Sequence, residues 1–351
     1  MFKPNFQRTD LLIDMIARIE VARDRILRAP VVPRWEAELR SDAVARSAHH
    51  STSIEGNPLS LEEVTDLLAG RDILAHPRDR QEVLNYAAVL RYVDRNFLSQ
   101  GREITEETIR RLHALVVKDL LPPTEVGHYR QVPVVVGVPA TGEVVFRPPD
   151  WASVPDLVAD LVLWLNGSES AGLMPVLEAG IAHYELVRIH PFVDGNGRTA
   201  RALATLVLCQ RGFDTKRFFA LDEYYNQDRA SYYEALRSVD PGTRELTEWL
   251  EYFVQGIAVE ITRVERRVQE MAGLYDLEAQ GQQIALNVRQ IKLLDYLRQS
   301  KAGIANQEYQ SLFRVSKRTA SNDLAELVTH GLLTVEGAGP ATRYRLSFSN
   351  G

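Results

Sequence analysis

The sequence predicts a mainly α-helical protein with one short β-hairpin in its helical core and a small helical module, closed by a second hairpin, at its C-terminal end. Two observations support this fold class. Apolar residues recur at the three- and four-residue spacing of amphipathic helices along most of the 351 residues. Strand-like segments with turn formers between them interrupt that pattern at residues 131–146 and 332–346. The length allows two or three domains.

The N-terminal region, residues 1–103, is expected to be helical throughout. Apolar side chains at helical spacing give a first helix over residues 11–19, and residues 36–52 give a second. Ser60 begins another helix, because Glu63 three positions later completes a capping box. Further helices are expected to begin near Asp79, Thr105 and Val154.

The first strand-like segment lies at residues 131–146. Valines dominate both halves of this segment, and the turn formers of residues 139–142 stand between them. The pattern is typical of a hairpin, and a plain buried hairpin is the simplest interpretation.

The most informative segment of the chain is HPFVDGNGRTAR, at residues 190–201. A helical pattern over residues 175–189 places His190 at a helix C-terminus, and the turn formers at residues 194–197 begin the next helix. Backbone N–H groups at a helix N-terminus attract anions, and glycines let an anion approach them closely. The segment therefore predicts an anion-binding turn with a histidine beside it.

Charged side chains make this turn a candidate polyphosphate site. Arg198 and Arg201 lie on neighbouring positions of the first helical turn, where two guanidinium groups can bind adjacent phosphates. Asp194 is an oxygen ligand of the kind that Mg²⁺ uses when it also bridges phosphates. His190, with an ordinary pKa of about 6.5, suits a general base. A zinc site of His183, His190 and Asp194 is a weaker alternative, because no cysteine or paired-histidine spacing accompanies it.

Residues 190–201 resemble the Fic family signature, H-P-F-x-[DE]-G-N-G-R-x-x-R, at every fixed position. The resemblance covers roughly residues 30–255. It implies a Fic (Fido) helical core at residues 104–257, with the hairpin as a flap beside the active site. It also implies protein AMPylation, in which ATP with Mg²⁺ donates AMP to a hydroxyl of a target protein and releases pyrophosphate.

The resemblance assigns a role to each residue of the segment. His190 would be the general base, Phe192 a core anchor of the loop, and Asp194 the Mg²⁺ ligand. The residues that cradle or bind the phosphates would be Gly195, Asn196, Gly197, Arg198 and Arg201. The flap residues that align the target segment by strand-like pairing would be Val144, Val145 and Phe146.

A second motif lies far upstream, at residues 51–56. Ser51 and Glu55 are four apart on one helix face, and Gly56 is suited to ending that helix. The motif resembles the inhibitory pattern [ST]-x-x-x-E-[GN] of Fic proteins, in the class where it precedes the core. The resemblance implies that Glu55 pairs with Arg201, which the γ-phosphate needs, so that ATP binds unproductively. Ser and Glu at this spacing are also common in surface helices.

The resemblance places the adenine pocket downstream of the phosphate site. Tyr232 and Tyr233 are similar to its paired-tyrosine position, although paired tyrosines are in general amphipathic core residues. Asp240 stands where some relatives place an asparagine, and this departure leaves the adenine contact at that position open.

The C-terminal residues 281–351 form a separate module, joined to the core by a helical linker at residues 258–280. Three helices and a hairpin are expected here, at residues 288–297, 306–313, 316–330 and 332–346. This arrangement resembles a winged helix–turn–helix domain. Residues 288–351 carry a net charge of +4 and the remainder −10. DNA binding through this module and its use in protein contact or homodimer packing both remain open.

The composition is that of an ordinary globular protein, with 45% hydrophobic and 25% charged residues and a net charge of −6. The single cysteine, Cys209, excludes an intrachain disulfide. The first residues contain no apolar signal core, and no run of apolar residues is long enough for a membrane span. We therefore expect a cytoplasmic protein without membrane partners.

Together these observations predict an autoinhibited protein adenylyltransferase that uses ATP and Mg²⁺ and modifies a Ser, Thr or Tyr hydroxyl of a target protein or of itself. Two alternatives remain open at this stage. One is a Fic enzyme that removes AMP or transfers another phosphate-linked group. The other is a transcriptional regulator whose Fic domain senses nucleotide and whose winged helix carries the activity.

Overall fold

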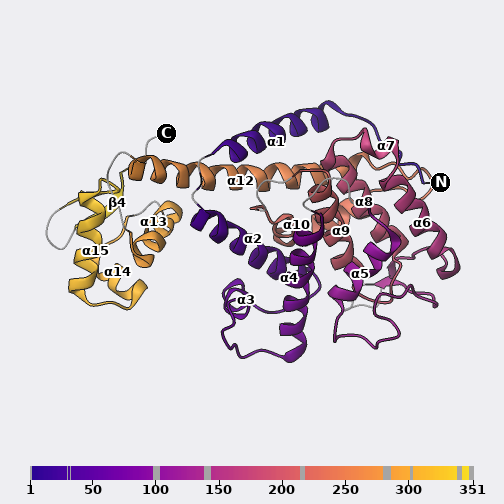
Figure 1. Ribbon diagram of the computed structural model, residues 1–351, viewed down its shortest axis with the longest axis horizontal. Helices are drawn as coiled ribbons and strands as arrows, with labels where there is room; N and C mark the ends of the chain where they lie inside the picture. The colour runs from indigo at the N-terminus through magenta and orange to yellow at the C-terminus, as the bar shows by residue number, and fades with distance from the viewer. Residues whose placement is uncertain are drawn as a thin grey trace. The chain divides into compact units, whose positions relative to one another are not determined.

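The computed structural model describes residues 2–29, 31, 33–97, 103–137, 144–213, 218–279, 286–300, 303–337 and 342–347 (Figure 1). The chain divides into two compact units, Met1–Met271 and Ala272–Gly351. The first unit is helical apart from one short hairpin, and the second combines three helices with a two-stranded sheet. The mainly helical fold class predicted from the sequence is confirmed.

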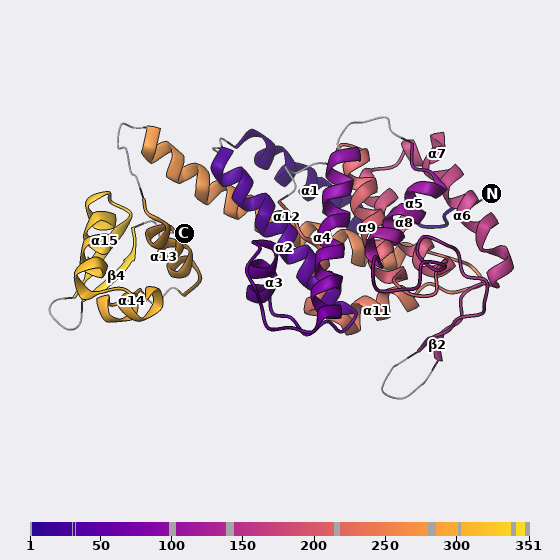
Figure 2. The same ribbon diagram turned by 60° about the horizontal axis from the view of Figure 1, so that its bottom comes forward.

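The first unit contains twelve α-helices in the described ranges, and Figure 2 shows its short hairpin at the edge of the helical body. The helices are α1 Asp10–Arg28, α2 Pro33–Ile54, α3 Leu61–Leu68, α4 Pro77–Phe97, α5 Glu106–Val116, α6 Val154–Leu165, α7 Ser168–Ala171, α8 Pro175–Ile189, α9 Asn196–Gln210, α10 Leu221–Gln227, α11 Arg229–Arg237 and α12 Thr247–Ala279. A 3-10 turn, η1, spans Trp151–Ser153.

The expected hairpin is present with shorter strands than the sequence suggested. Strand β1 spans Val136–Gly137 and strand β2 spans Val144–Phe146, and they pair antiparallel with Val136 opposite Phe146. The valines at 132, 134 and 135 precede β1 in irregular backbone. The expected turn at residues 139–142 lies outside the described residues.

Local signals placed the helix starts well. Ser60 and Glu63 form the predicted capping box, since the Ser60 N–H donates to Glu63 Oε2 over 2.8 Å and the Glu63 N–H donates to Ser60 Oγ over 3.3 Å. Thr105 caps α5 in the same way, and Pro175 occupies the first turn of α8. Helix α4 begins at Pro77, two residues before the expected start near Asp79.

Helices α8 and α9 form the centre of the first unit and pack against each other (Figure 1). Both are buried along almost their whole length, which is typical of a helix enclosed on all sides. At Gly180 a Cβ would lie 2.9 Å from Leu250 Cδ2 and 3.0 Å from Phe253 Cδ1, so α12 packs closely on α8 at this glycine. The turn between α8 and α9 is therefore held by two fixed helices.

The second unit has the elements expected from its sequence. These are α13 Val288–Ser300, α14 Asn306–Phe313, α15 Lys317–Thr329, β3 Leu333–Glu336 and β4 Arg343–Leu346. The strands pair antiparallel, and Ile304 adds an isolated bridge to Tyr344. Leu294, Tyr309 and Leu324 are among the side chains of its own core. The unit thus combines three helices, a hairpin and a separate core, whereas its assignment as a winged helix stays a prediction.

The division of the chain differs from the expected boundaries. Residues 1–103 and 104–257 lie together in the first compact unit. Residues 258–279 of the expected linker at 258–280 are the second half of α12, and Ile261, Val264 and Val268 are buried there, so the part up to Met271 belongs to the first unit. None of the described helices is both long enough and apolar enough to cross a membrane.

Candidate active site at the turn between α8 and α9

His190 ends α8 in the left-handed region, with φ 52° and ψ 58°. Its Nδ1 lies 3.2 Å from the Val187 carbonyl oxygen. Because a carbonyl can only accept, Nδ1 carries the proton in this arrangement and Nε2 presents its lone pair. Burial lowers the pKa of His190; the bond to Val187 opposes this effect and the charge of Arg130 adds to it. A neutral imidazole with a free Nε2 is what a general base requires.

Arg130 is buried and fastens the His190 loop to the base of the hairpin. Its Nε donates to the His190 carbonyl over 2.8 Å, and its Nη2 donates to the Pro149 carbonyl over 2.6 Å. Its backbone N–H donates to the Pro191 carbonyl over 2.9 Å, and its Nη1 donates to the Val132 carbonyl over 3.3 Å. Sequence reasoning missed Arg130, because a single arginine before a hairpin carries no local signal.

Replacing Arg130 by methionine is expected to raise the pKa of His190, because a positive charge that opposes imidazole protonation is removed. Replacing it by lysine keeps the charge, so the pKa should stay lowered while the loop loses its forked bonds. NMR titration of the His190 ring in both variants measures this, with thermal midpoints as a check on folding. Equal titration of the methionine variant and the wild type would contradict an electrostatic effect of Arg130.

The side chains of Phe192 and Asn196 stabilise the turn between α8 and α9. Phe192 is fully buried and stacks on His113 with ring centroids 3.7 Å apart. The Asn196 side chain accepts from the Phe192 N–H over 2.9 Å and donates to the Phe192 carbonyl over 2.9 Å. The core-anchor position of Phe192 is therefore as expected. The Asn196 amide, expected among the phosphate contacts, is bonded at both ends within the loop.

His113, on α5, supports the same turn and was also missed in the sequence. Its Nδ1 accepts from the Gly127 N–H over 3.0 Å, so its Nε2 carries the proton and donates to the Asp194 carbonyl over 3.0 Å. Burial lowers the pKa of His113 to about 4, which keeps the ring neutral in this bonding pattern.

Gly195 and Gly197 stand where a side chain would not fit. Gly195 precedes α9 with φ 76°, and a Cβ there would lie 2.7 Å from Val117 Cγ1. A Cβ on Gly197 would lie 2.5 Å from Glu55 Oε1. The Glu55 carboxylate thus lies against the first turn of α9 at Gly197.

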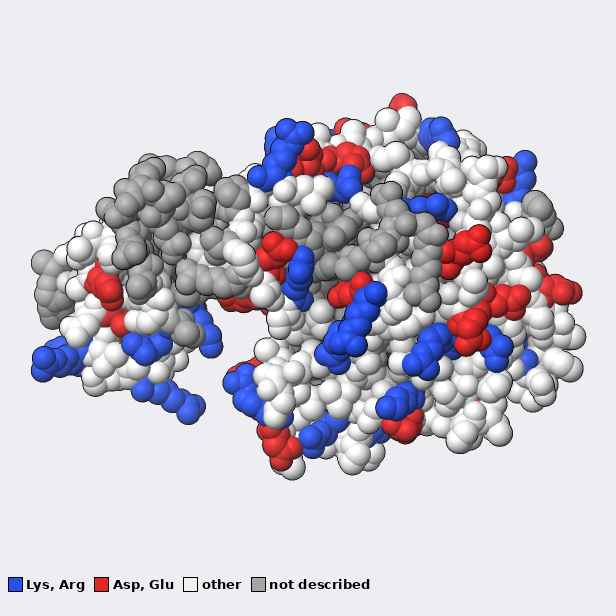
Figure 3. All heavy atoms as spheres, in the orientation of Figure 1, with Lys and Arg blue, Asp and Glu red and all other residues white. Residues whose placement is uncertain are grey.

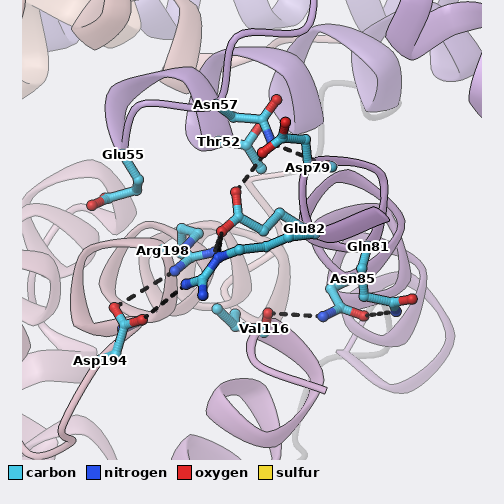
Figure 4. Close-up of polar contacts among 12 residues, drawn as sticks. Thr52, Glu55, Asn57, Asp79, Gln81, Glu82, Asn85, Val116, Asp194 and Arg198 are labelled. Carbon is cyan, nitrogen blue, oxygen red and sulfur yellow. Dashed lines mark hydrogen bonds and ion pairs between the residues drawn. The ribbon is translucent and has the colours of Figure 1, made fainter. Parts of the chain in front are cut away.

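Arg198 is a buried guanidinium whose hydrogen-bonding capacity is unfilled. Its Nη2 lies 3.7 Å from Asp194 Oδ1 and its Nη1 lies 3.6 Å from Glu82 Oε1 (Figure 4). Within the described part of the chain, its Nε and Nη1 have no hydrogen-bond partner. Buried donors without partners are rare in folded proteins. Their presence beside a helix N-terminus fits a site built for an anion.

Asp194 is the residue of this turn that could hold Mg²⁺ beside phosphates. Its side chain is half exposed, and Oδ1 accepts from the Gly195 N–H over 2.6 Å. In the described ranges, no three His, Cys, Asp or Glu side chains come together as metal ligands. One carboxylate supplemented by substrate phosphates fits Mg²⁺ rather than an all-protein metal site. The zinc alternative is not formed, since His183 is buried with its Nε2 2.9 Å from the Tyr232 hydroxyl.

Arg201 joins α9 to the end of α2, as the upstream motif predicted. Its Nη2 donates to Glu55 Oε1 over 2.7 Å, and its Nε donates to Ser51 Oγ over 2.8 Å. Asp222, which the sequence did not indicate, lies 3.3 Å from the Arg201 Nε. Burial opposes the charge of Arg201, yet Glu55 and the groups around it hold its pKa well above the usual range. Gly56 follows with φ 100°, just beyond the end of α2.

The two tyrosines of the expected adenine pocket have different environments. Tyr232 is 1% exposed and stacks on Tyr225, whereas Tyr233 is 40% exposed. Of this pair, only the Tyr233 ring is therefore open to a ligand. Asp240 is fully exposed at a turn, where its Oδ1 accepts from the N–H groups of Gly242 and Thr243.

The flap residues lie on β2, with Val144 exposed and Val145 and Phe146 half-buried. Among the described strands, β2 pairs with β1 alone, so its second edge keeps main-chain groups free for a further strand. The structure thus brings together His190, the α9 turn, Arg198, Arg201 and the inhibitory motif. Tyr232 lies in the core beside them.

Comparisons with known proteins relate this chain to proteins of one family. The Fic/DOC family model matches residues 103–208. Protein adenylyltransferase fic-1 of Caenorhabditis briggsae is 33% identical over 218 residues, which are 61% of this chain and 40% of that protein. The chain therefore spans less than half the length of this relative.

Two solved structures resemble the whole chain or most of it. A Fic family protein from Desulfovibrio desulfuricans G20 has a TM-score of 0.65 at 24% identity, covering all of both chains. Fic-1 from C. elegans has a TM-score of 0.59 at 28% identity, covering 75% of this chain and 72% of that structure. The first of these likenesses supports the fold alone.

Proposed function

We propose, since residues 103–208 form a domain of the Fic/DOC family, that this chain is a protein adenylyltransferase. The observation that carries the proposal is the contact of His190 Nδ1 with the Val187 carbonyl, which leaves Nε2 to accept a proton on the same turn as the unfilled donors of Arg198. The first is suited to taking a proton, and the second to holding a polyphosphate. The named relative is an adenylyltransferase as well, which disfavours the alternative of a nucleotide-sensing transcriptional regulator.

In the proposed reaction, His190 Nε2 accepts the proton of a Ser, Thr or Tyr hydroxyl on the target or on the chain itself. The hydroxyl oxygen forms a bond to the α-phosphorus of ATP, and the bond from that phosphorus to the bridging oxygen breaks, which releases pyrophosphate. Arg198 and the N–H groups at the start of α9 hold the phosphates and offset their charge. Mg²⁺ bound by Asp194 would neutralise phosphate charge and orient the leaving group.

We further propose that the protein is autoinhibited by Glu55. Its Oε1 pairs with Arg201 and lies in the space above Gly197, so it competes with a phosphate for both. The main-chain edge of β2 would hold the target segment beside this site. A cytoplasmic location, a homodimer and self-modification stay predictions from the sequence.

Incubation of the protein with α-labelled ATP, Mg²⁺ and a lysate, followed by mass spectrometry of labelled proteins, tests the function. The expected product carries AMP on a hydroxyl side chain. Addition of a phosphate or of another phosphate-linked group would assign a different transfer to the same site. Loss of AMP from a protein adenylylated beforehand, without any forward labelling, would support the reverse reaction.

Arg198 and Asp194 are expected to give separable defects. Replacing Arg198 by alanine should weaken ATP binding roughly tenfold or more, because charge-assisted bonds to phosphate are lost. Replacing Asp194 by alanine should mainly reduce the dependence of transfer on Mg²⁺. Titrations of each variant with ATP at several Mg²⁺ concentrations measure both effects. Identical defects would argue against separate roles.

The second unit presents basic side chains whose surroundings differ. Arg314 is exposed at the end of α14, and Lys317 and Arg318 are exposed at the start of α15. Arg343 and Arg345 instead pair with Glu308 and Glu336 over 3.2 Å and 3.0 Å. Figure 3 shows Lys and Arg interspersed with Asp and Glu on the visible surface, so no large area of a single sign faces the viewer. Lys317 and Arg318 at the start of α15 are therefore exposed candidates for DNA contact by this unit.

If the unit binds DNA, its affinity for DNA should fall steeply as the salt concentration rises. The slope of the logarithm of affinity against the logarithm of salt concentration should decrease in magnitude by about one in Lys317→Ala or in Arg318→Ala. Arg345→Ala, which removes an already paired charge, serves as the matched control and should change the slope less. Salt titrations of the full chain on duplex DNA measure these slopes. No binding at low salt would favour a protein-contact role for the unit.

A further inference from the structure

Asn57 directly follows the inhibitory motif, and its side-chain amide and its backbone N–H are all hydrogen-bonded. Its Nδ2 donates to Glu82 Oε2 over 3.0 Å and to the Asp79 carbonyl over 3.0 Å, and both acceptors lie on α4 (Figure 4). Its Oδ1 accepts from the Leu59 N–H over 3.2 Å. Its own N–H donates to the Thr52 carbonyl over 3.1 Å. One buried side chain thus ties the end of α2 to α4.

This attachment controls the position of Glu55. The Glu55 carboxylate is 32% exposed and reaches Arg201 from the turn that follows α2. Only Gly56 separates Glu55 from Asn57, and two residues of chain span at most about 7 Å. As long as Asn57 stays on α4, Glu55 therefore stays near Arg201. Release of Asn57 would free the turn, in which Gly56 already has the permissive conformation of a glycine.

Glu82 connects this attachment to the phosphate site. Its Oε2 accepts from Asn57, while its Oε1 lies 3.6 Å from Arg198 Nη1 and 3.4 Å from Arg78 Nε. Figure 4 shows Glu82 between Asn57 and Arg198, with Asp194 on the other side of the guanidinium. Glu82 is 9% exposed and Arg198 is 3% exposed, so solvent screens this pair weakly. The Glu82 carboxylate therefore contacts both Asn57, next to the inhibitory motif, and Arg198, which we propose binds phosphate.

We propose that Asn57 and Glu82 are positioning residues that form a latch. Asn57 holds Glu55 over Arg201, and Glu82 holds both Asn57 and Arg198 in place. The inference rests on the proposed function, because it assigns the regulation of the same site. While the bond between Asn57 and Glu82 is present, the turn at residues 55–57 is fixed. When the bond between Asn57 and Glu82 is lost, the turn moves away and Arg201 becomes available to a phosphate.

The near-isosteric variant Asn57→Asp tests the latch, because it removes both donated bonds and places a second carboxylate against Glu82. Transfer should rise about tenfold, the factor expected for the loss of hydrogen bonds worth about 1.4 kcal/mol. Hydrogen exchange at the amides of residues 55–57, which are bonded to Thr52 and Ser53, should accelerate. The matched control is Asp79→Asn, since Asn57 bonds the carbonyl of Asp79 and not its side chain. It should behave like the wild type in both measurements.

The double variant Asn57→Asp with Glu82→Gln restores a bond of reversed polarity, because the glutamine amide can donate to the new carboxylate. Transfer and amide exchange should return several-fold toward the wild type, which a loss of general stability would not produce. Glu82→Gln alone should tighten ATP binding, since it removes a negative charge beside Arg198. Absence of rescue, or unchanged exchange in Asn57→Asp, would overturn the latch.

Glu55→Gly separates this inference from the proposed function. If Glu55→Gly raises transfer while Asn57→Asp changes neither transfer nor exchange, the latch is wrong and the autoinhibited transferase stands. If Glu55→Gly shows no transfer of AMP, the proposed function fails. Amide exchange in the Asn57 variants still measures the latch in that case, because it requires no activity.

Discussion

Replacing His190 by alanine is expected to lower AMP transfer by about 10² to 10⁴-fold, the range typical for removal of a general base. The ring sits at the end of α8, with Nδ1 held by the Val187 carbonyl and Nε2 left to accept a proton. An alanine keeps the backbone of the turn but supplies no acceptor. ATP binding should change little, because Arg198 and the N–H groups of α9 remain in place.

Single-turnover transfer and calorimetric ATP binding, measured on the same preparation, separate chemistry from affinity in His190→Ala. His183→Gln serves as a comparison, since His183 is a buried histidine of α8 that lies in the aromatic core. That variant should lose stability rather than the chemical step. Transfer by His190→Ala at a rate near that of the wild type would exclude His190 as the base.

The wild-type pH dependence of transfer should reflect the same residue. Because burial and Arg130 lower the pKa of His190, the imidazole stays neutral to lower pH than an exposed histidine does. The acid limb of the transfer profile should therefore lie below the ordinary histidine pKa of about 6.5.

The sequence predicted those site residues whose positions are determined by local chain geometry. His190, the turn glycines and the two arginines of α9 lie within twelve consecutive residues, and periodicity and turn chemistry specify the helices on either side. The contact between Glu55 and Arg201 spans 146 positions, yet it could be inferred because a resemblance linked two short motifs.

The residues that the sequence did not reveal act through distant contacts. Arg130 reaches the His190 carbonyl across 60 positions, and Asn57 reaches Glu82 across 25. Neither residue belongs to a local pattern, because an arginine before a hairpin and an asparagine after a glycine are ordinary loop residues. The different burial of Tyr232 and Tyr233 also depends on how α11 packs, which adjacency in sequence cannot specify.

In each of these distant contacts, another element places a charged or polar group against the turn between α8 and α9 or the first turn of α9. Arg130 approaches from the hairpin base, His113 from α5, Glu82 from α4 and Glu55 from the end of α2. Helix α9 supplies the anion site that we propose, and its neighbours pair with its two arginines. The regulation that we propose would therefore depend on the neighbours of α9 more than on the signature itself.

Replacing Glu55 by glycine is the second change with a large expected effect. It removes the carboxylate from Arg201 and from the space above Gly197, while Ser51 and Asp222 still hold the guanidinium in place. Labelling of a target or of the chain itself should rise roughly 10- to 100-fold, since a hydrogen bond between charged groups contributes about 1.5–3 kcal/mol.

The double variant Glu55→Gly with His190→Ala decides whether this gain comes from the same site. Relief of inhibition opens Arg201 to the γ-phosphate but supplies no proton acceptor, so the double variant should fall to the level of His190→Ala. Labelling with α-labelled ATP, at ATP concentrations that saturate each variant, compares the four proteins of this cycle. If Glu55→Gly binds ATP but transfers no faster than the wild type, the pairing of Glu55 with Arg201 is a structural contact at a helix end and not an inhibitory one.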